Sequence, residues 1–261
     1  MKFQAAVFDW AGTMIDFGSF APMGVFVEAF SRFGIKATIA DARGPMGRPK
    51  RAHIQAMLAQ NGIRRQWEAA HGGAPTEADV DAIYEIFVPM NEEVAPRYAA
   101  LVPGAKGAVD QLAARGIRVG STTGYTRSIM ARVLPAAAAQ GYAPECVVCA
   151  DDVADGRPGP GQMLRAMELL GVTDGAAVVK VDDTEPGIAE GVAVGALTVG
   201  VAMSGNHVGL TPEDLAALPA PERERLRTRA TEALRGAGAD HVIDTVADLP
   251  ALLAMLEHVR A

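Results

Sequence analysis

Cysteine is scarce in this sequence, since only Cys146 and Cys149 occur among its 261 residues, as a single Cys-Val-Val-Cys run. The spacing is that of a redox motif or half of a zinc site, but no second pair exists to complete such a zinc site. The run is typical of a strand, on which residues three apart point to opposite faces. We therefore expect two buried structural cysteines. So little cysteine also favours the reducing cytoplasm.

The sequence also lacks an excess of positive charge and any long apolar run. The formal net charge of −7 gives no electrostatic reason for binding nucleic acid or an anionic membrane. No apolar run reaches membrane-spanning length, and residues 1–9 lack the apolar region of a signal peptide. Aromatic residues make up only 5%, but 49% hydrophobic and 21% charged residues are typical of a folded globular protein. We expect neither nucleic acid nor membrane as a partner, and an anionic substrate needs local cations or a metal.

The order of the expected elements indicates an α/β fold. Short apolar runs typical of buried strands lie at 4–8, 117–121, 145–149, 177–181, 196–201 and 241–243. Helical patterns follow several of them, at 105–114, 127–140, 162–170 and 248–259. This alternation predicts a Rossmann-like parallel sheet with helices on both faces.

The stretch from about residue 17 to residue 97 breaks the alternation. It contains no convincing strand and at least three helical patterns, one of which spaces Val80, Ile83, Tyr84 and Phe87 along a single helix face. A helical block inserted after the first strand predicts a small α-helical cap domain, with hinges near 16–19 and 96–102. We assign residues 1–17 and 100–261 to the core domain and residues 18–99 to the cap.

Polar groups end three of the expected strands. Asp9 follows the first, the run 121–123 (STT) follows the second, and Asp182 and Asp183 follow a later one. In open parallel sheets, ligands bind beyond the carboxyl ends of the strands. A lone aspartate there is more often a turn or cap residue, but three such ends together indicate a site for phosphate and Mg²⁺, which prefers oxygen ligands.

These motifs resemble those of the haloacid dehalogenase superfamily. Residues 9–16 (DWAGTMID) resemble its first motif, whose leading aspartate often attacks phosphorus, and 121–124 (STTG) resemble its phosphate-binding hydroxyl motif. The pair at 182–183 resembles its magnesium-binding acids. Phosphatases of the superfamily carry a general acid two residues after the nucleophile, where this sequence has Ala11. The absence fits a carbon leaving group, which offers no oxygen to protonate and needs an electron sink such as a lysine imine.

A more specific resemblance, to the phosphonoacetaldehyde hydrolase family, covers essentially the whole chain. It is carried by residues 8–13 (FDWAGT), by 46–53 (MGRPKRAH) in the cap and by 120–127 (GSTTGYTR). Shorter matches lie at 96–98, 151–153, 156–158, 181–188 and 209–211. The resemblance implies magnesium-dependent cleavage of the carbon–phosphorus bond of phosphonoacetaldehyde, in 2-aminoethylphosphonate degradation. It also implies a homodimer formed through the cap.

The resemblance implies a role for each matching residue. Asp9 is the expected nucleophile that forms an aspartyl-phosphate, Lys50 the imine-forming lysine, and His53 a group that moves protons. Mg²⁺ is expected on Asp9, Asp183 and the backbone carbonyl of Ala11. Substrate contacts are expected from Met46, Gly47, Thr123, Gly124, Tyr125 and Arg157, with Thr13 and Ser19 as further polar lining.

Several of these assignments have simpler alternatives. A lysine in a helical pattern is usually a solvated charge, and a lone histidine or tyrosine is more often structural. To attack a carbonyl, Lys50 needs a pKa well below about 10.4, and we expect burial and a nearby cation, Arg48 or Arg51, to lower it. Asp182 is expected either to contribute to the site or to lie behind the metal ligands or in a loop, because adjacent residues of a regular strand cannot both face the metal.

Some relatives have an acid where this chain has Gly187. Glu185 is a weak candidate to replace that acid. Two rival functions also remain at this stage. One is a phosphatase or phosphoglucomutase-like enzyme acting on phosphate esters, against which Ala11 counts. The other is a non-catalytic metabolite-binding protein, for which the joint presence of Asp9, Lys50, Thr123 and Asp183 has no explanation.

Overall fold

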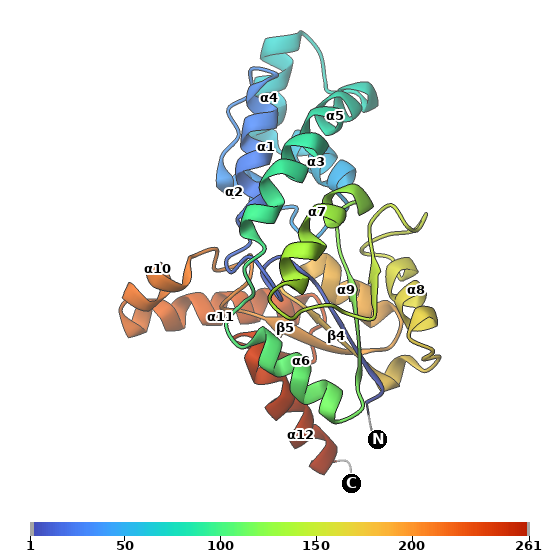
Figure 1. The fold of residues 1–261 in the computed structure, drawn as a ribbon. Coiled ribbons are helices and arrows are strands. Elements are labelled where there is room, and N and C mark those ends of the chain that lie inside the picture. The colour runs from blue at the N-terminus through green and yellow to red at the C-terminus, as the bar shows by residue number, and fades with distance from the viewer. Residues whose placement is uncertain (1–2, 260–261) are drawn as a thin grey trace.

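A single sheet of six parallel strands forms the centre of the computed structural model, which describes residues 3–259 (Figure 1). In chain order the strands are β1 (Ala5–Phe8), β2 (Arg118–Thr122), β3 (Cys146–Val148), β4 (Val178–Asp182), β5 (Leu197–Val201) and β6 (His241–Ile243). Their order across the sheet is β3-β2-β1-β4-β5-β6. Phe8 is aligned with both Ser121 and Val181. The residues that follow these three in sequence therefore meet at one edge, as the strand-end argument requires.

Helices cover both faces of the sheet, as the sequence predicts. The helices are α6 (Ala105–Ala114), α7 (Arg127–Ala138), α8 (Gly161–Leu169), α9 (Glu185–Ala193), α10 (Pro212–Ala217), α11 (Ala220–Gly236) and α12 (Leu249–Val259), with short 3₁₀ turns η2 (Gly175–Ala177) and η3 (Val246–Asp248). Along β1, Ala6 and Phe8 pack with α6, α7 and α12, whereas Ala5 and Val7 pack with α8. Each strand thus buries both of its faces, which is why it appears in the sequence as a continuous apolar run.

The predicted strands and core helices are found with small shifts at their ends. The two cysteines are free thiols that join hydrophobic clusters on opposite faces of the sheet, as expected. Cys149 is buried, but Cys146 is only partly so, because β3 lies at the edge of the sheet.

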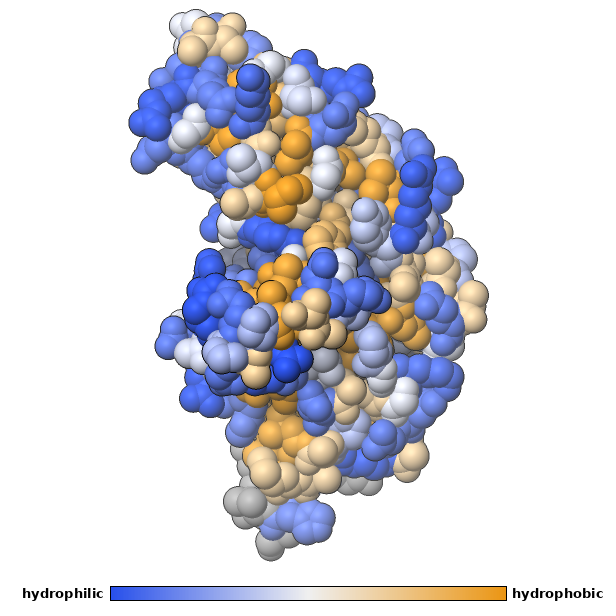
Figure 2. All heavy atoms as spheres, turned by 90° about the vertical axis from the view of Figure 1, so that its left-hand side faces the viewer, coloured by the Kyte–Doolittle hydropathy of each residue, from blue (hydrophilic) through white to orange (hydrophobic). Residues whose placement is uncertain are grey.

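A block of helices is inserted in the chain after β1 and before β2, and it stands above the sheet in Figure 1. It consists of α1 (Ala21–Ser31), α2 (Ile39–Arg43), α3 (Lys50–Ala59), α4 (Asn61–His71), α5 (Glu77–Val94) and the 3₁₀ turn η1 (Ala95–Tyr98). These helices enclose a hydrophobic cluster of their own, which includes Phe26, Phe30, Trp67 and Phe87. On the face drawn in Figure 2, a notch separates this block from the core. No helix within residues 3–259 has the length and apolarity to span a membrane.

The two chain segments that join the helical block to the core are hydrogen-bonded to each other. The backbone N–H of Asp16 donates to the carbonyl of Ala100, and that of Val102 donates to Met14. In the first segment, Asp16 and Ser19 both have φ of 54°, an uncommon backbone conformation that costs about 1–3 kcal/mol per residue. The Asp16 carboxylate accepts hydrogen bonds from the first N–H groups of α1. These hydrogen bonds therefore hold the first linker in a defined turn conformation.

Candidate active site

A small cavity lies where the helical block meets the carboxyl edge of the sheet. It is lined by Asp9, Ala11, Ser19, Pro22, Met46, Gly47, Lys50, Thr123, Gly124, Tyr125, Arg157 and Thr184. The cavity therefore brings together all six predicted substrate-contact residues with the predicted nucleophile and imine-forming lysine, and Ser19 lines it as well. Thr13, His53 and Asp183 do not line it.

Asp9 stands at the end of β1 with its side chain almost fully buried. Its Oδ1 atom accepts an ion-paired hydrogen bond of 2.7 Å from Nη1 of Arg157. Burial, and then the neighbouring Asp182, raise the pKa of Asp9 to about 6, against the opposing effect of Arg157 and Lys180. The charged form that a nucleophile needs therefore depends on cations close to it.

Three aspartates, Asp9, Asp182 and Asp183, offer oxygen atoms that all lie within 4.8 Å of one another. Asp183 is fixed by hydrogen bonds from the Thr13 hydroxyl (3.0 Å) and the Asn206 N–H (2.8 Å). Its pKa is raised well above the usual range by burial and by the charges of the other two aspartates. A buried, mutually repelling set of carboxylates fits a hard divalent cation, which supplies the missing positive charge.

Asp182 is not among the residues that line the cavity. Its carboxylate accepts a hydrogen bond from the Thr184 hydroxyl (2.7 Å) and forms an ion pair with Lys180 Nζ (3.0 Å). A Cβ atom on Gly187 would stand only 1.9 Å from Oδ2 of Asp182. Asp182 therefore fills the space that a side chain at position 187 would need. Glu185 does not replace that missing acid, because it pairs instead with His207 at 3.3 Å, outside the aspartate cluster.

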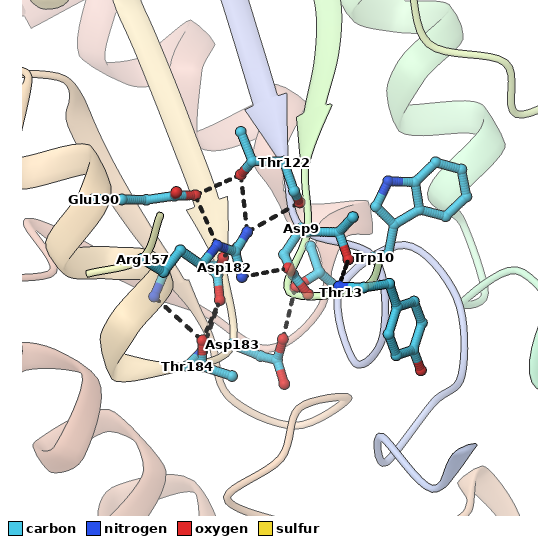
Figure 3. Close-up of polar contacts among 12 residues, drawn as sticks. Asp9, Trp10, Thr13, Thr122, Arg157, Asp182, Asp183, Thr184 and Glu190 are labelled. Carbon is cyan, nitrogen blue, oxygen red and sulfur yellow. Dashed lines mark hydrogen bonds and ion pairs between the residues drawn. The ribbon is translucent and has the colours of Figure 1, made fainter. Parts of the chain in front are cut away.

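A buried network of charges lies beside Asp9 (Figure 3). Arg157 contacts Glu190 Oε1 (3.1 Å), Asp182 Oδ2 (3.3 Å) and both oxygens of Thr122, at 3.0 and 2.8 Å. Lys180 Nζ contacts Glu190 (2.6 Å) and Thr122 (2.7 Å), and the Thr122 hydroxyl also donates to Glu190. The network holds the Arg157 guanidinium against Asp9 from behind, which leaves little freedom in its orientation.

Sequence reasoning missed Lys180 and Glu190. Lys180 was hidden inside an apolar strand run, although a charged residue two positions before Asp182 on a buried strand must face the same side and needs a partner. Thr184 and Pro22 were also missed as cavity residues. The Thr-Glu-Pro sequence at 184–186 is the signature of a helix start, and Thr184 does cap α9. Its position beside the cavity follows from that cap.

Among the residues of the helical block that line the cavity with Asp9, Lys50 is the one with a basic side chain. Only 4% of it is exposed, and its Nζ atom lies 4.7 Å from the centroid of the Tyr125 ring and 5.8 Å from that of Phe26. Burial lowers the pKa of Lys50 to about 8, with Asp9 opposing the shift and Arg157 adding to it. At pH 7 about one-tenth of the amine is therefore unprotonated, far more than for a lysine with the ordinary pKa of about 10.4.

Comparison with known proteins assigns the family. The model of the haloacid dehalogenase-like hydrolases matches residues 3–195. The phosphonoacetaldehyde hydrolase of Paraburkholderia phytofirmans is 49% identical over 246 residues, 94% of this chain and 92% of that protein. That of Bordetella pertussis is 46% identical over 257 residues, which cover 98% and 93%. This chain belongs to the phosphonoacetaldehyde hydrolase family.

A solved structure agrees with this assignment. The crystal structure of a phosphonoacetaldehyde hydrolase-like protein from Oleispira antarctica superposes with a TM-score of 0.97 at 43% identity, covering 99% of this chain and 94% of that one. The chain is thus a hydrolase of the haloacid dehalogenase type, and its Rossmann-like core with inserted helices is the fold of that family.

The cation that helps to lower the pKa of Lys50 differs from the one expected. Arg51 lies on the surface of the helical block, where it pairs with Asp81 (2.6 Å) and Glu77 (2.8 Å). Arg48 is exposed. Arg157 of the core provides the nearby positive charge instead. Arg48 lies before the start of α3, and Arg51, the neighbour of Lys50 on the helix, faces another direction. Of the three, only Lys50 lines the cavity.

His53 is fully buried one helical turn after Lys50. Its ring stacks on Phe26 with centroids 4.0 Å apart, and Nε2 lies 2.8 Å from the carbonyl oxygen of Ala42, so Nε2 carries a proton and donates it. Burial, and then the charge of Lys50, lower the pKa of His53 well below 6.5. His53 is therefore neutral, and its Nδ1 has no hydrogen-bond partner among the described residues.

Two glycines allow the helical block to press against the core. Gly47 has φ of 85°, and a Cβ atom there would lie 2.2 Å from the Thr184 hydroxyl oxygen. A Cβ atom on Gly124 would lie 2.8 Å from the backbone oxygen of Arg48. These contacts bring the segment before α3 directly against the carboxyl edge of the sheet.

Proposed function

We propose that this hydrolase cleaves the carbon–phosphorus bond of phosphonoacetaldehyde, giving acetaldehyde and phosphate. The observation that carries the proposal is the burial of Lys50 in the same cavity as Asp9, with Ala11 where a phosphatase has its general acid. The names of the relatives at 46–49% identity support the same substrate. We also propose that the substrate is formed during the degradation of 2-aminoethylphosphonate.

The residues fit Mg²⁺ as a cofactor. Asp9, Asp183 and the backbone carbonyl of Ala11 would hold it, because their oxygens are the ligand type that this ion prefers. When bound, it would offset the charges of the aspartates and of the phosphonate oxygens. Asp182 would take no direct part, since Lys180 and Thr184 already occupy its carboxylate.

In the proposed reaction, the Lys50 amine adds to the aldehyde and water leaves, which gives a protonated imine. A carboxylate oxygen of Asp9 then attacks phosphorus in line with the carbon–phosphorus bond. The bond electrons move to carbon and into the iminium, so that the leaving group is an enamine. Protonation at carbon and hydrolysis release acetaldehyde and the free Lys50 amine. Water hydrolyses the aspartyl-phosphate to phosphate and Asp9.

Other cavity residues would position the substrate. Arg157 and Thr123 are suited to the phosphonate oxygens, with Gly124 permitting close approach of the backbone. Tyr125 faces the amine of Lys50 and, with Met46 and Gly47, would enclose the aldehyde. His53 would accept or return protons through Nδ1 during imine formation. Closure of residues 18–99 over the remaining core would exclude water from the intermediates.

Two further proposals concern the quaternary structure and the cell compartment. We propose a homodimer formed through the cap helices, which equilibrium sedimentation tests directly. We also propose a cytoplasmic location, in keeping with the two free thiols.

The decisive experiment measures acetaldehyde and phosphate released from phosphonoacetaldehyde with Mg²⁺ by the wild type and by Lys50→Arg. We expect equal amounts of both products from the wild type and near-total loss in the variant. Borohydride added during turnover should attach the substrate carbons to Lys50 irreversibly. Equal rates for both proteins would remove Lys50 from the mechanism. A folded, Mg²⁺-loaded wild type that is inactive here but hydrolyses phosphate esters would overturn the substrate.

A further inference from the structure

Arg43, the last residue of α2, connects the cap to a loop of the core. Its Nη1 atom donates to the carbonyl of Gly18 (2.9 Å) in the first linker and to the Asn206 side-chain oxygen (3.1 Å) in the core. The Asn206 amide donates in return to the Arg43 carbonyl (3.2 Å). The guanidinium also packs over Phe20, 5.3 Å from the ring centroid. One half-buried side chain thus contacts the cap, the linker and the core.

The core loop that Arg43 binds also holds the proposed metal site. The backbone N–H of Asn206 donates to Oδ2 of Asp183 at 2.8 Å. Two residues earlier, the Ser204 hydroxyl donates to the Gly12 carbonyl at 2.8 Å, and the Ser204 carbonyl accepts from Gly18 N–H at 2.8 Å. The loop is therefore bonded to an acid of the metal site, to the turn after Asp9 and to the linker on which the cap moves.

We propose that Arg43 is a positioning residue that couples closure of the cap to the metal-binding geometry of Asp183. With the cap closed, Arg43 fixes Asn206, and the Asn206 N–H fixes one oxygen of Asp183. When the cap moves away, Arg43 leaves and the loop loses its external support. Coupling between two binding events is reciprocal, so a bound metal must in turn favour the closed cap. The inference rests on the metal site proposed above.

The test compares Arg43→Ala with Arg51→Ala, since Arg51 is a second cap arginine whose ion pairs stay within the cap. Mn²⁺ binding, followed by electron paramagnetic resonance without substrate, should weaken at least about fivefold in Arg43→Ala. It should be unchanged in Arg51→Ala. Mg²⁺ should slow hydrogen exchange at residues 16–20 in the wild type and in Arg51→Ala but not in Arg43→Ala.

Asn206→Ala provides a second variant, because it removes the side chain that Arg43 binds and leaves the backbone N–H for Asp183. It should weaken Mn²⁺ binding to a similar extent, and the double variant should be no worse than either single one. Additive losses, unchanged Mn²⁺ affinity in folded Arg43→Ala, or Mg²⁺ protection that survives the substitution would each overturn the coupling. Failure of the wild type to bind Mn²⁺ would reject the metal site itself, and the coupling with it.

Discussion

The Nζ atom of Lys50 lies 4.7 Å from the centroid of the Tyr125 ring, one residue belonging to the cap and the other to the core. The ring face attracts an ammonium group, whereas burial of the same group opposes its charge. Burial prevails, since the pKa of Lys50 falls to about 8. The amine therefore titrates much closer to neutral pH than an ordinary lysine does.

We predict that Lys50 titrates with a midpoint near pH 8. Trapping of the imine by borohydride should therefore rise with pH up to about 8 and then level off, because only the neutral amine attacks.

The free energy of unfolding should also depend on pH through Lys50. Between pH 8 and about 10.5 the unfolded chain binds more protons at Lys50 than the folded one, so its contribution to stability improves as pH rises.

Lys50→Met serves as the reference for that stability prediction, since it removes the titrating group. The difference in free energy of unfolding between wild type and variant should shift in favour of the wild type as pH rises through that window. If borohydride trapping of Lys50 instead showed a midpoint near pH 10, burial would not lower the pKa of this amine.

We predict that Gly124→Ala impairs closure without unfolding the core. The new Cβ atom would meet the Arg48 backbone oxygen at 2.8 Å, and backbone cannot easily move aside. Because small misplacements of reacting groups cost about 100-fold in rate, we expect a loss of that size in turnover with little change in melting temperature. Gly107→Ala, where nothing lies within 4 Å, is the matched control and should retain full activity.

We predict that Glu190→Gln destabilises the protein by about 3 kcal/mol, because it leaves the buried charges of Arg157 and Lys180 undercompensated. Urea denaturation measures the loss. Glu168→Gln removes only an exposed pair with Arg165 and should change stability by less than about 1 kcal/mol. Equal stability for both variants would show that the network does not depend on Glu190.

We predict that Asp182 and Gly187 can be exchanged only together. Gly187→Asp alone should destabilise the protein strongly, because its Cβ would overlap the Asp182 carboxylate at 1.9 Å. The double variant Asp182→Ala/Gly187→Asp vacates that space and places a carboxylate in it from the helix side. It should recover much of the stability lost in the single variant, as the difference between their thermal midpoints will show. No recovery would mean that the two positions do not share the space.

The fold was largely predictable because its signals are local. Apolar runs gave the strands, and the spacing of Val80, Ile83 and Phe87 gave a cap helix whose buried face they form. Asp9 and Asp182 could be placed together because parallel strands end at one edge. The contact between Lys180 and Glu190 could not be foreseen, since it depends on how closely α9 approaches β4. Gly191, whose Cβ would lie 2.7 Å from that of Lys180, sets the approach.

The sequence also did not reveal in which direction neighbouring side chains point. Residue patterns alone do not separate Arg48, Lys50 and Arg51 as candidates for the cavity until the start of the helix is known to one residue, and only the family resemblance singled out Lys50. Likewise, Glu185 could be considered as a substitute for an acid at position 187 until its pairing with His207 was known. A sequence pattern indicates which segment reaches a site more reliably than which side chain does.

Lys50 is also the first residue of α3, with Pro49 before it. The unpaired N–H groups of a helix start carry a partial positive charge, which favours anions there and opposes cations by about 0.3–1 kcal/mol. Helical side chains tilt toward the start of their helix, so the Lys50 chain extends from the tip of α3 toward the core. The backbone thus adds to the forces that favour the neutral amine, independently of any neighbouring side chain. Adding one helical turn before position 50 would move that dipole end away and raise the basicity of the lysine, even with every cavity residue in place.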